Sequence, residues 1–330
     1  MATLKLGDTG SCPAMYTTPE FIGIQREISS QGKFQMPSTD FTFSLPNNVI
    51  SLGKSALYNA FSSCQNLTSV SFPMLTTISE DYALYAAFES CRNLTSVSFP
   101  MLTTISGQTI FRYTFSSCEK LTSISFPMLT SISGSRAFEE AFHYCSKLSA
   151  ASFPSLTNVS GLNAFGDTFN GCTVLKNVSF PALTTVSSNG SGTFSRAFYN
   201  CISLSSIDLS ALTTVSSSEA FRNAFYNCQN LNSINFQSLN SISGYIAFSQ
   251  AFDNCKNLAN IYFPALTTTS FGNSYINQFS NLLYNTGSET IHTVHFPSNL
   301  QSTISGLTGY PLFGGTSGYV TLSFDLPATS

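Results

Sequence analysis

Cysteine is the residue type whose spacing first suggests chemistry, because eight of the nine cysteines follow one another at 27-residue intervals, with one interval of 29. They are Cys64, Cys91, Cys118, Cys145, Cys172, Cys201, Cys228 and Cys255. The chain lacks the C-x-x-C pair that is typical of cysteine metal sites, so a metal site is not expected. Equivalent side chains in stacked units would point in parallel, and this geometry suits disulfides poorly. We expect a buried ladder of reduced thiols that act as small hydrophobic groups, with disulfides as the alternative. Cys12, outside the ladder, is the one thiol expected to be reactive.

The histidines are too few and too scattered to predict a metal site or acid–base chemistry. They are His143, His292 and His295. His292 and His295 lie at odd spacing on one predicted strand, so their side chains should point to opposite faces of a sheet. We therefore expect the histidines to be polar surface residues, and we predict no metal site.

Motifs for catalysis are also missing from the sequence. Serine is so abundant that a Ser-His-Asp set would arise by chance, and the chain has no G-x-S-x-G elbow, no P-loop and no G-x-G-x-x-G after a strand. The acidic residues include Glu80, Asp81, Glu139 and Glu140, which we expect to be solvated surface charges. The sequence predicts a protein that is not an enzyme and needs no cofactor. The alternative is a catalytic site in residues 271–330, where the repeat decays.

The elements that would carry these side chains repeat with the same period. A phenylalanine stands three residues before each ladder cysteine and another apolar residue stands four before that, as in Phe111, Phe115 and Cys118. This i, i+4, i+7 spacing predicts the buried face of a helix of about two turns. After each cysteine, a Leu-x-x-Val-x-Phe-Pro segment such as 67–73 alternates like a strand and ends at proline. A second short apolar pair, such as Leu75 and Ile78, precedes the turn toward the next helix.

No unit of this size can bury its apolar residues alone, but stacked units place Leu on Leu, Phe on Phe and Cys on Cys. The pattern Ala-Phe-x-x-Cys-x-x-Leu, as at 60–67 and 251–258, resembles the BspA-like leucine-rich repeat family of bacterial surface proteins over about residues 50–270. We expect an α/β repeat solenoid. It would be a leucine-rich-repeat right-handed superhelix with a parallel β-sheet on one face, short helices on the other and non-repeat caps at both ends.

The repeat pattern suggests three parts of the chain. Residues 1–49 would form an N-terminal cap or attachment segment, residues 50–269 about eight repeats, and residues 270–330 degenerate repeats with a C-terminal cap. Segment 41–45 looks like a first strand, and segments 291–297 and 319–324 look like the last two. We expect Leu282 to replace the ladder cysteine near the C-terminal end, and the glycine-rich stretch 306–318 to be a loop.

Composition excludes several classes of partner. Charged residues are only 9% of the chain, against about 25% in typical domains, and the net charge of −3 is spread without a run of either sign. Nucleic acid is therefore not an expected partner, and no apolar stretch is long enough for membrane insertion. The first residues lack the basic and apolar regions of a secretory signal. Either a signal has been removed, or the protein does not use that route.

The outward positions of the strand segments are the main candidate for recognition. Early repeats carry only Ser and Thr there, whereas later repeats carry larger polar residues that suit an interface better. The candidate ligand-binding residues are Lys176, Asn177, Asp208, Asn232, Asn235, Asn260 and Tyr262. The alternative, that they only solubilise an exposed sheet, stays open. A second candidate surface is the set of helix-side loops with Tyr85, Arg112, Arg136, Tyr245 and Tyr275.

The family resemblance implies a non-catalytic recognition or adhesion module, extracellular or at the cell surface, that binds a host protein or glycan through the repeat surface. The alternative is a structural or receptor-binding protein of a bacteriophage tail or fibre, located in the virion. It is suggested by the opening residues Leu4 to Asp8, which look similar to those of phage tail proteins. In that case the chain would assemble into a larger structure.

Overall fold

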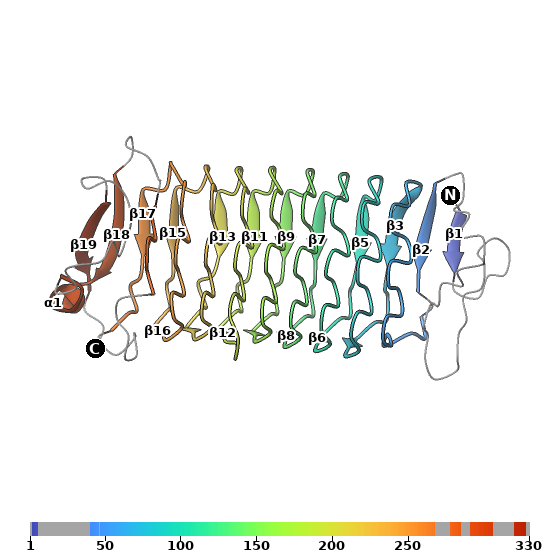
Figure 1. Ribbon diagram of the computed structural model, residues 1–330, viewed down its shortest axis with the longest axis horizontal. Helices are drawn as coiled ribbons and strands as arrows, with labels where there is room; N and C mark the ends of the chain where they lie inside the picture. Colours follow the sequence, from blue (N-terminus) through green and yellow to red (C-terminus); the bar gives the residue numbers. More distant parts are fainter. Residues whose placement is uncertain are drawn as a thin grey trace.

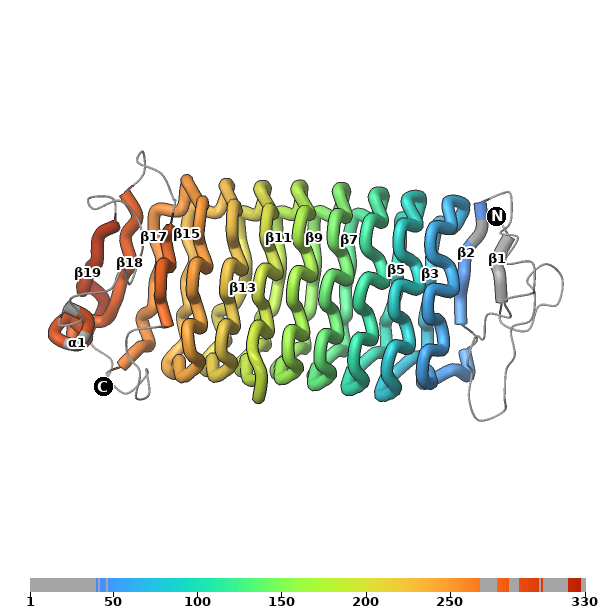
Figure 2. Tube along the Cα trace, in the orientation of Figure 1, coloured from blue at the N-terminus to red at the C-terminus, as the bar shows by residue number. Residues whose placement is uncertain are grey.

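The computed structural model describes residues 2–5, 40–45, 47–267, 278–284, 291–305 and 320–327. These residues wind into an elongated stack of coils, with one repeat in each coil and the long axis running from the N-terminal to the C-terminal end (Figure 1; Figure 2). The repeat is 27 residues long in most coils. Each coil contains a first strand, a shorter second strand and a turn segment that holds the Phe-x-x-Cys residues. The expected solenoid with parallel sheets is confirmed. Cys12, Tyr275 and the stretch 306–318 lie outside the described residues.

The first strands pair in parallel and in register, so that equivalent residues of successive coils are partners, as Ser123 and Ala150 are. They are β3 (Leu67–Ser71), β5 (Ser96–Ser98), β7 (Ser123–Ser125), β9 (Ala150–Ser152), β11 (Asn177–Ser179), β13 (Ser206–Asp208), β15 (Ser233–Asn235) and β17 (Asn260–Tyr262). Their ladder is divided twice, between β5 and β7 and between β13 and β15. The central residues of the strands that precede these two breaks, Val97 and Ile207, are only partly buried.

The second strands form one continuous seven-stranded parallel sheet. They are β4 (Thr77–Ile78), β6 (Thr104–Ile105), β8 (Ser131–Ile132), β10 (Asn158–Val159), β12 (Thr185–Val186), β14 (Thr214–Val215) and β16 (Ser241–Ile242). A threonine before most of these strands donates its hydroxyl to the carbonyl of the equivalent threonine one coil earlier, as from Thr103 to Thr76 (2.9 Å) and from Thr130 to Thr103 (3.1 Å). These side-chain bonds add a second ladder beside the backbone ladder.

Columns of equivalent apolar side chains fill the interior. Phe115 stacks on Phe88 and on Phe142, each with ring centroids 5.5 Å apart. The eight ladder cysteines are buried and free, which confirms the buried thiol ladder. Each thiol from Cys91 onward donates to the carbonyl of the ring residue one coil earlier, as from Cys145 Sγ to Phe115 (3.1 Å). The stacked core therefore holds the coils together through rings, thiols and backbone at once.

The turn segment is not helical, so the expected short helices, and with them the α/β class, are wrong. Alternate N–H groups donate to the next coil instead of to a residue four back, as from Phe115 to Ala141 (2.9 Å). The N–H groups between them close tight turns, as from Thr114 to Phe111 (3.0 Å). Every fourth residue has a positive φ, in one coil Thr109, Tyr113 and Ser117. Apolar residues at i, i+4 and i+7 suit this row of turns as well as a helix, and bonds to the next coil continue the stack.

The ends of the stack carry the predicted terminal strands. Strand β2 (Phe41–Ser44) pairs with β3 and with β1 (Ala2–Lys5), and β18 (His292–Pro297) pairs with β17 and with β19 (Val320–Leu326), all in parallel. A 3-10 turn, η1 (Ser298–Leu300), and one short helix, α1 (Gln301–Ser305), follow β18. The handedness, the terminal caps and the three-part division stay predictions.

The expectation that Leu282 replaces a ladder cysteine is wrong. The N–H of Phe252 donates to Leu282 O (3.0 Å), as that of Phe225 donates to Ala251 O (2.8 Å) one coil earlier. Leu282 is therefore the equivalent of Ala251, and Leu283 takes the ring position of Phe252. The last coil is longer than the others, and that extra length displaced the register expected from a constant period.

Candidate functional site

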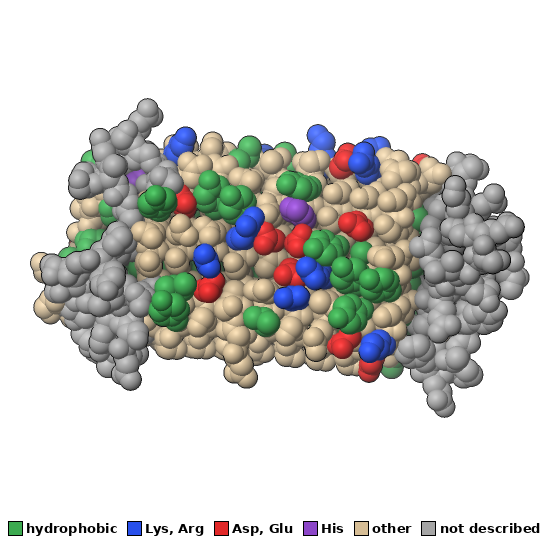
Figure 3. All heavy atoms as spheres, in the orientation of Figure 1, with side chains coloured by type: hydrophobic (Ala, Val, Ile, Leu, Met, Phe, Trp, Pro, Cys, Tyr) green, Lys and Arg blue, Asp and Glu red, His purple; other side chains and the backbone are tan. Residues whose placement is uncertain are grey.

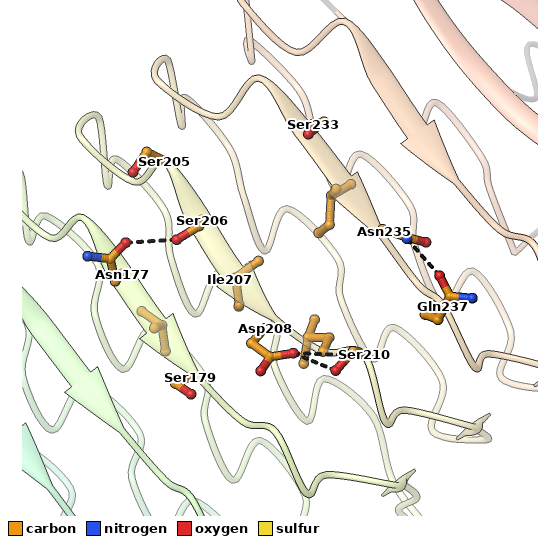
Figure 4. A pocket seen from close by; sticks show the side chains of 13 residues that line it. Asn177, Ser179, Ser205, Ser206, Ile207, Asp208, Ser210, Ser233, Asn235 and Gln237 are labelled. Carbon is orange, nitrogen blue, oxygen red and sulfur yellow. Dashed lines mark hydrogen bonds between the residues drawn. The ribbon is translucent and has the colours of Figure 1, made fainter.

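A groove opens on the outward face of the first strands at the break between β13 and β15. It has a volume of about 580 Å³ and extends across β11, β13 and β15. Figure 4 shows polar side chains of the three strands pointing out of the sheet around Ile207. We call this site the β11–β15 groove. Its lining residues are Asn177, Val178, Ser179, Ser205, Ser206, Ile207, Asp208, Leu209, Ser210, Ser233, Ile234, Asn235 and Gln237.

The groove lies where the repeat sequence changes. Five earlier coils end the first strand with Ser-Phe-Pro, whereas this coil has Asp208, Leu209 and Ser210. Unlike proline, Ser210 has a backbone N–H, and it donates this N–H (3.1 Å) and its hydroxyl (2.7 Å) to Asp208 Oδ1. Leu209 also replaces a ring in the phenylalanine column. It directly follows β13, the strand that is not paired with β15. The groove therefore coincides with local departures from the repeat.

The polar groups of the groove are arranged as alternating donors and acceptors. Ser206 Oγ donates to Asn177 Oδ1 (2.7 Å), and Asn235 Nδ2 donates to Gln237 Oε1 (2.9 Å). These bonds do not use the Asn177 and Gln237 amide N–H groups, Asn235 Oδ1 or Asp208 Oδ2, which have no further partner within the described part of the chain. Asp208 is the only charged lining residue. Such a surface suits an uncharged ligand with many hydroxyl groups.

The predicted ligand-binding residues all lie on this one face. Asn177, Asp208 and Asn235 line the groove. Lys176 and Asn232 stand just before β11 and β15 and are exposed, but they do not line it. Asn260 and Tyr262 lie on β17, the strand that pairs with β15.

Beyond the groove, Tyr262 stacks on His295 of β18, with ring centroids 4.4 Å apart. His295 lies between Asn260 Oδ1, 3.0 Å from Nε2, and Asp325 Oδ1, 3.0 Å from Nδ1. The hydrogen bond with His295 lowers the pKa of Asp325. A polar cluster that contains an aromatic pair therefore continues the face across β17, β18 and β19.

One of the three histidines, His292, is not the surface residue that the sequence predicted. His292 is 1% exposed and its Nδ1 contacts the Leu258 carbonyl, while His295 faces outward on the same strand, so the predicted opposite orientation is correct. His143 is half-buried beside Glu140. His292 is buried because its side chain lies inside the last coil. The spacing of the two histidines does not reveal which of them points inward.

Sequence reasoning missed part of this surface. Ser210 and Gln237 were overlooked although both replace the repeat proline, a signal visible in the sequence. His295 and Asp325 were overlooked because they belong to strands whose register appears only when the last coils are stacked. Among the described residues, no group of three or more His, Cys, Asp or Glu side chains could hold a metal ion.

The turn segments form a second surface with different chemistry. Figure 3 shows hydrophobic side chains, tyrosines included, gathered beside acidic and basic side chains on one face. Arg112 is 2.6 Å from Glu139, and Arg196 is 3.0 Å from Asp167. Glu139 is therefore half-buried in an ion pair, not a solvated charge as expected. Tyr245, from the same predicted surface, is exposed.

Several solved structures resemble this chain. A leucine-rich repeat protein of T. pallidum is 24% identical, with 58% of this chain and 77% of that chain covered and a TM-score of 0.38. A leucine-rich repeat protein of Bacteroides ovatus is 19% identical, with 88% and 94% covered and a TM-score of 0.25. A leucine-rich cell surface protein of Faecalibacterium prausnitzii is 18% identical, with 77% and 78% covered and a TM-score of 0.28. The curated protein sequences contain no significant match.

The family comparison covers most of the chain. The sequence profile described as a BspA type leucine rich repeat region of six copies matches residues 30–168, 85–223 and 139–283. Leucine-rich repeat proteins of this type generally bind proteins and are often found at the cell surface. No helix in the described ranges is both long and apolar enough to cross a membrane. The bacteriophage alternative stays a prediction. With its repeats stacked in parallel coils and matched over residues 30–283, this chain belongs to the BspA-type leucine-rich repeat family.

Proposed function

We propose that this chain is a non-catalytic recognition module that binds a glycan at the cell surface through the β11–β15 groove and the adjoining Tyr262–His295 pair. The observation that carries the proposal is the lining of the groove, in which amide and hydroxyl groups surround a single carboxylate. Sugar hydroxyls both donate and accept hydrogen bonds, so alternating amide and carboxylate groups match them. A protein ligand is the alternative, because leucine-rich repeats commonly bind proteins.

The location of the groove supports the proposal. A repeat protein needs no departure from its consensus to remain folded, yet the residues at 208–210 and 237 depart from it together and produce a hollow. Tyr262 supplies an aromatic ring beside the groove, and rings with a polar edge are well suited to binding surfaces. Asn177, Asp208, Asn235, Asn260 and Tyr262 therefore have a common role in the proposal, with Lys176 and Asn232 at its margin.

The test is a glycan array probed with the full chain, followed by titration of the strongest glycan by calorimetry. The double variant Asp208→Ser, Ser210→Pro restores residues that five earlier coils carry, so it should fold. We expect it to weaken binding by a factor of about 10 or more, because each buried hydrogen bond lost costs about 1–3 kcal/mol. Ser125→Ala, at the equivalent outward position of β7, is the matched control and should bind normally.

Two outcomes would contradict the proposal. Unchanged affinity in the double variant, and in a triple variant of Asn235, Asn260 and Tyr262 to alanine, would remove the site assignment. Groove-dependent binding of a protein, with no glycan bound on the array, would keep the site and reject the ligand class.

A further inference from the structure

Four tyrosines gather on the turn segments of the first coils, away from the β11–β15 groove. We call Tyr58, Tyr82, Tyr85 and Tyr113 the tyrosine patch. Tyr58 and Tyr85 stack with centroids 4.8 Å apart and nearly parallel rings, and Tyr113 meets Tyr85 edge to face at 5.8 Å. Tyr58 is 44% exposed and Tyr82 is 38% exposed. Clustered exposed rings of this kind mark an interaction surface more often than isolated ones do.

The fold does not require aromatic rings at these positions. The positions equivalent to Tyr58 and Tyr85 in later coils hold Arg112, Glu139 and Gly166. Those equivalent to Tyr82 and Tyr113 are equally varied. The rings point away from the phenylalanine columns, which are complete without them. The patch is therefore an addition to the scaffold and not part of its core.

A carboxylate without an ion-pair partner borders the patch. Glu89, on the same turn segment as Tyr85, has no ion pair among the described residues, because Arg112 is taken by Glu139 at 2.6 Å. Burial, and then repulsion from Glu140, raises the pKa of Glu89. The charges of Glu89 and Glu140 also reach Tyr85. Local negative charge beside electron-rich ring faces attracts a cation.

The chain already shows how a cation binds to such rings. The Arg112 guanidinium lies over the Tyr113 ring, 4.8 Å from its centroid, and Arg196 lies over Tyr199 at 4.5 Å. Arg112 occupies the position equivalent to Tyr85 one coil later, so the same column already holds a guanidinium beside aromatic rings. Arginine stacks on aromatic faces more readily than lysine, because its planar group is weakly hydrated.

We propose that the tyrosine patch is a second binding surface, which takes an arginine side chain from an extended basic segment of a protein partner. Because Tyr58 and Tyr85 stack on each other, the guanidinium lies over the face of Tyr58 that is turned away from Tyr85, and Glu89 supplies the negative charge beside the ring pair. This surface is on the turn segments of the first three coils, whereas the groove is on the first strands of later coils. The two sites therefore bind different ligands and do not compete.

The probe is an amidated, acetylated (Gly-Arg)4 peptide, compared with the (Gly-Lys)4 and (Gly-Gln)4 peptides. Calorimetry gives the affinity. Because the chain contains no tryptophan, a change in tyrosine fluorescence can also be followed, and it is assigned to the patch when the variant that lacks Tyr58 and Tyr85 does not show it. We expect the arginine peptide to bind more tightly than the lysine peptide, and the glutamine peptide not to bind. Binding should weaken with salt, since the counter-ion is partly exposed.

The decisive variant is Tyr58→Ser, Tyr85→Ser, which places at both sites the residue that Ser195 and Ser249 provide in later coils. This variant should lower the affinity for the arginine peptide about fivefold or more, and its thermal unfolding should be unchanged. Glu89→Gln should lower the affinity for the arginine peptide about threefold and reduce the salt dependence of binding. Tyr226→Ala, which removes the half-buried ring pair with Tyr199 (4.2 Å) on the turn segments of later coils, is the matched control and should bind normally.

Two results would overturn the inference: equal binding of the arginine peptide by the serine variant and the parent chain, or equal affinity for the arginine and glutamine peptides at physiological salt. Glycan binding in the groove should be the same in all these variants. The failure of this inference is therefore separable from the failure of the proposed function.

Discussion

The outward face of β11 to β17 and the turn segments of the first coils stand on the same buried columns but carry different chemistry. The strand face has amides, hydroxyls and one carboxylate around the groove. The turn segments carry tyrosines and most of the ion pairs, including Arg112 with Glu139 and Arg196 with Asp167. One scaffold therefore presents two surfaces that suit different ligands.

The two surfaces fill their columns of equivalent side chains differently. On the strand face, equivalent side chains lie directly over one another at a spacing of about 4.8 Å, so a column of like charges would repel itself. Small neutral residues avoid that cost. On the turn segments, opposite charges can alternate along a column, as Arg112 and Glu139 do at equivalent positions of neighbouring coils. The turn segments therefore carry charges that pair along a column, whereas the strand face carries mostly small neutral residues.

The largest expected effect is on the columns that support both faces. Phe142→Ala removes a ring that stacks on Phe115 and Phe169, each 5.5 Å away. We expect a loss of about 3–5 kcal/mol in the free energy of unfolding, measured by urea denaturation. Ser125→Ala on the strand face should change it by less than about 0.5 kcal/mol. Similar losses in the two variants would mean that the faces do not rest on a common core.

A smaller loss is expected at the corner between the second strand and the turn segment. A Cβ at Gly134 would overlap the Gly107 carbonyl oxygen of the preceding coil, so the coils must separate to admit it. Gly134→Ala should cost about 3 kcal/mol, because this overlap involves backbone. At Gly166, on the outer column of the turn segment, the nearest atoms lie at 3.4 Å, and Gly166→Ala should be nearly neutral in the same denaturation experiment. Equal costs would show that the outer column is as restricted as the corner.

The sequence predicted the columns better than the path between them. The constant period of cysteine and phenylalanine predicted which side chains stack. The alternation at 291–297 and 319–324 predicted two strands. Both signals depend on burial alone. The turn segment was assigned as helix because a helix and a row of four-residue turns bury the same positions. The positive-φ positions offered no warning, since they hold Tyr113 and Glu140 as well as asparagines.

The candidate site was only partly visible in the sequence. Asn177, Asp208 and Asn235 were chosen as large polar residues on an outward face, and they line one groove. The groove itself lies where β13 and β15 are not paired. This missing pairing involves both strands and cannot be predicted from the sequence of either one alone. The association of His295 with Tyr262 likewise follows from the register of the longer last coil.

The two faces should also respond to pH in opposite directions. Burial raises the pKa of Asp253, on a turn segment, to about 6, so its stabilisation is complete below about pH 4 and is lost as the pH rises through 6. The hydrogen bond with His295 lowers the pKa of Asp325 on the strand side. Its stabilisation is therefore present above about pH 4 and is lost as the pH falls below that value.

Asp253→Asn tests the turn-segment half of this contrast. The variant should gain about 2–3 kcal/mol at pH 7, corresponding to a shift of about two pKa units, and little at pH 4. Asp325→Asn should instead lose stability at pH 7 and be unchanged at low pH. Urea denaturation of both variants at pH 4 and pH 7 measures these differences, and the same sign of change at pH 7 would contradict the contrast.

The smallest expected effect is the reactivity of the ladder thiols in the folded chain. The outer side of the turn segments carries exposed side chains, but burial raises the pKa of Cys145 to about 12 and those of Cys118, Cys172 and Cys228 well above their ordinary value. Because the thiolate is the reactive form, a thiol reagent at pH 8 should label the ladder only as fast as the protein unfolds. The measurement uses a Cys12→Ser background, in which Cys145→Ala should remove one reactive equivalent in urea and none in buffer. Rapid labelling in buffer would mean that the reagent reaches the ladder thiols in the folded chain. The turn segments would then shield the core less completely than the strands do.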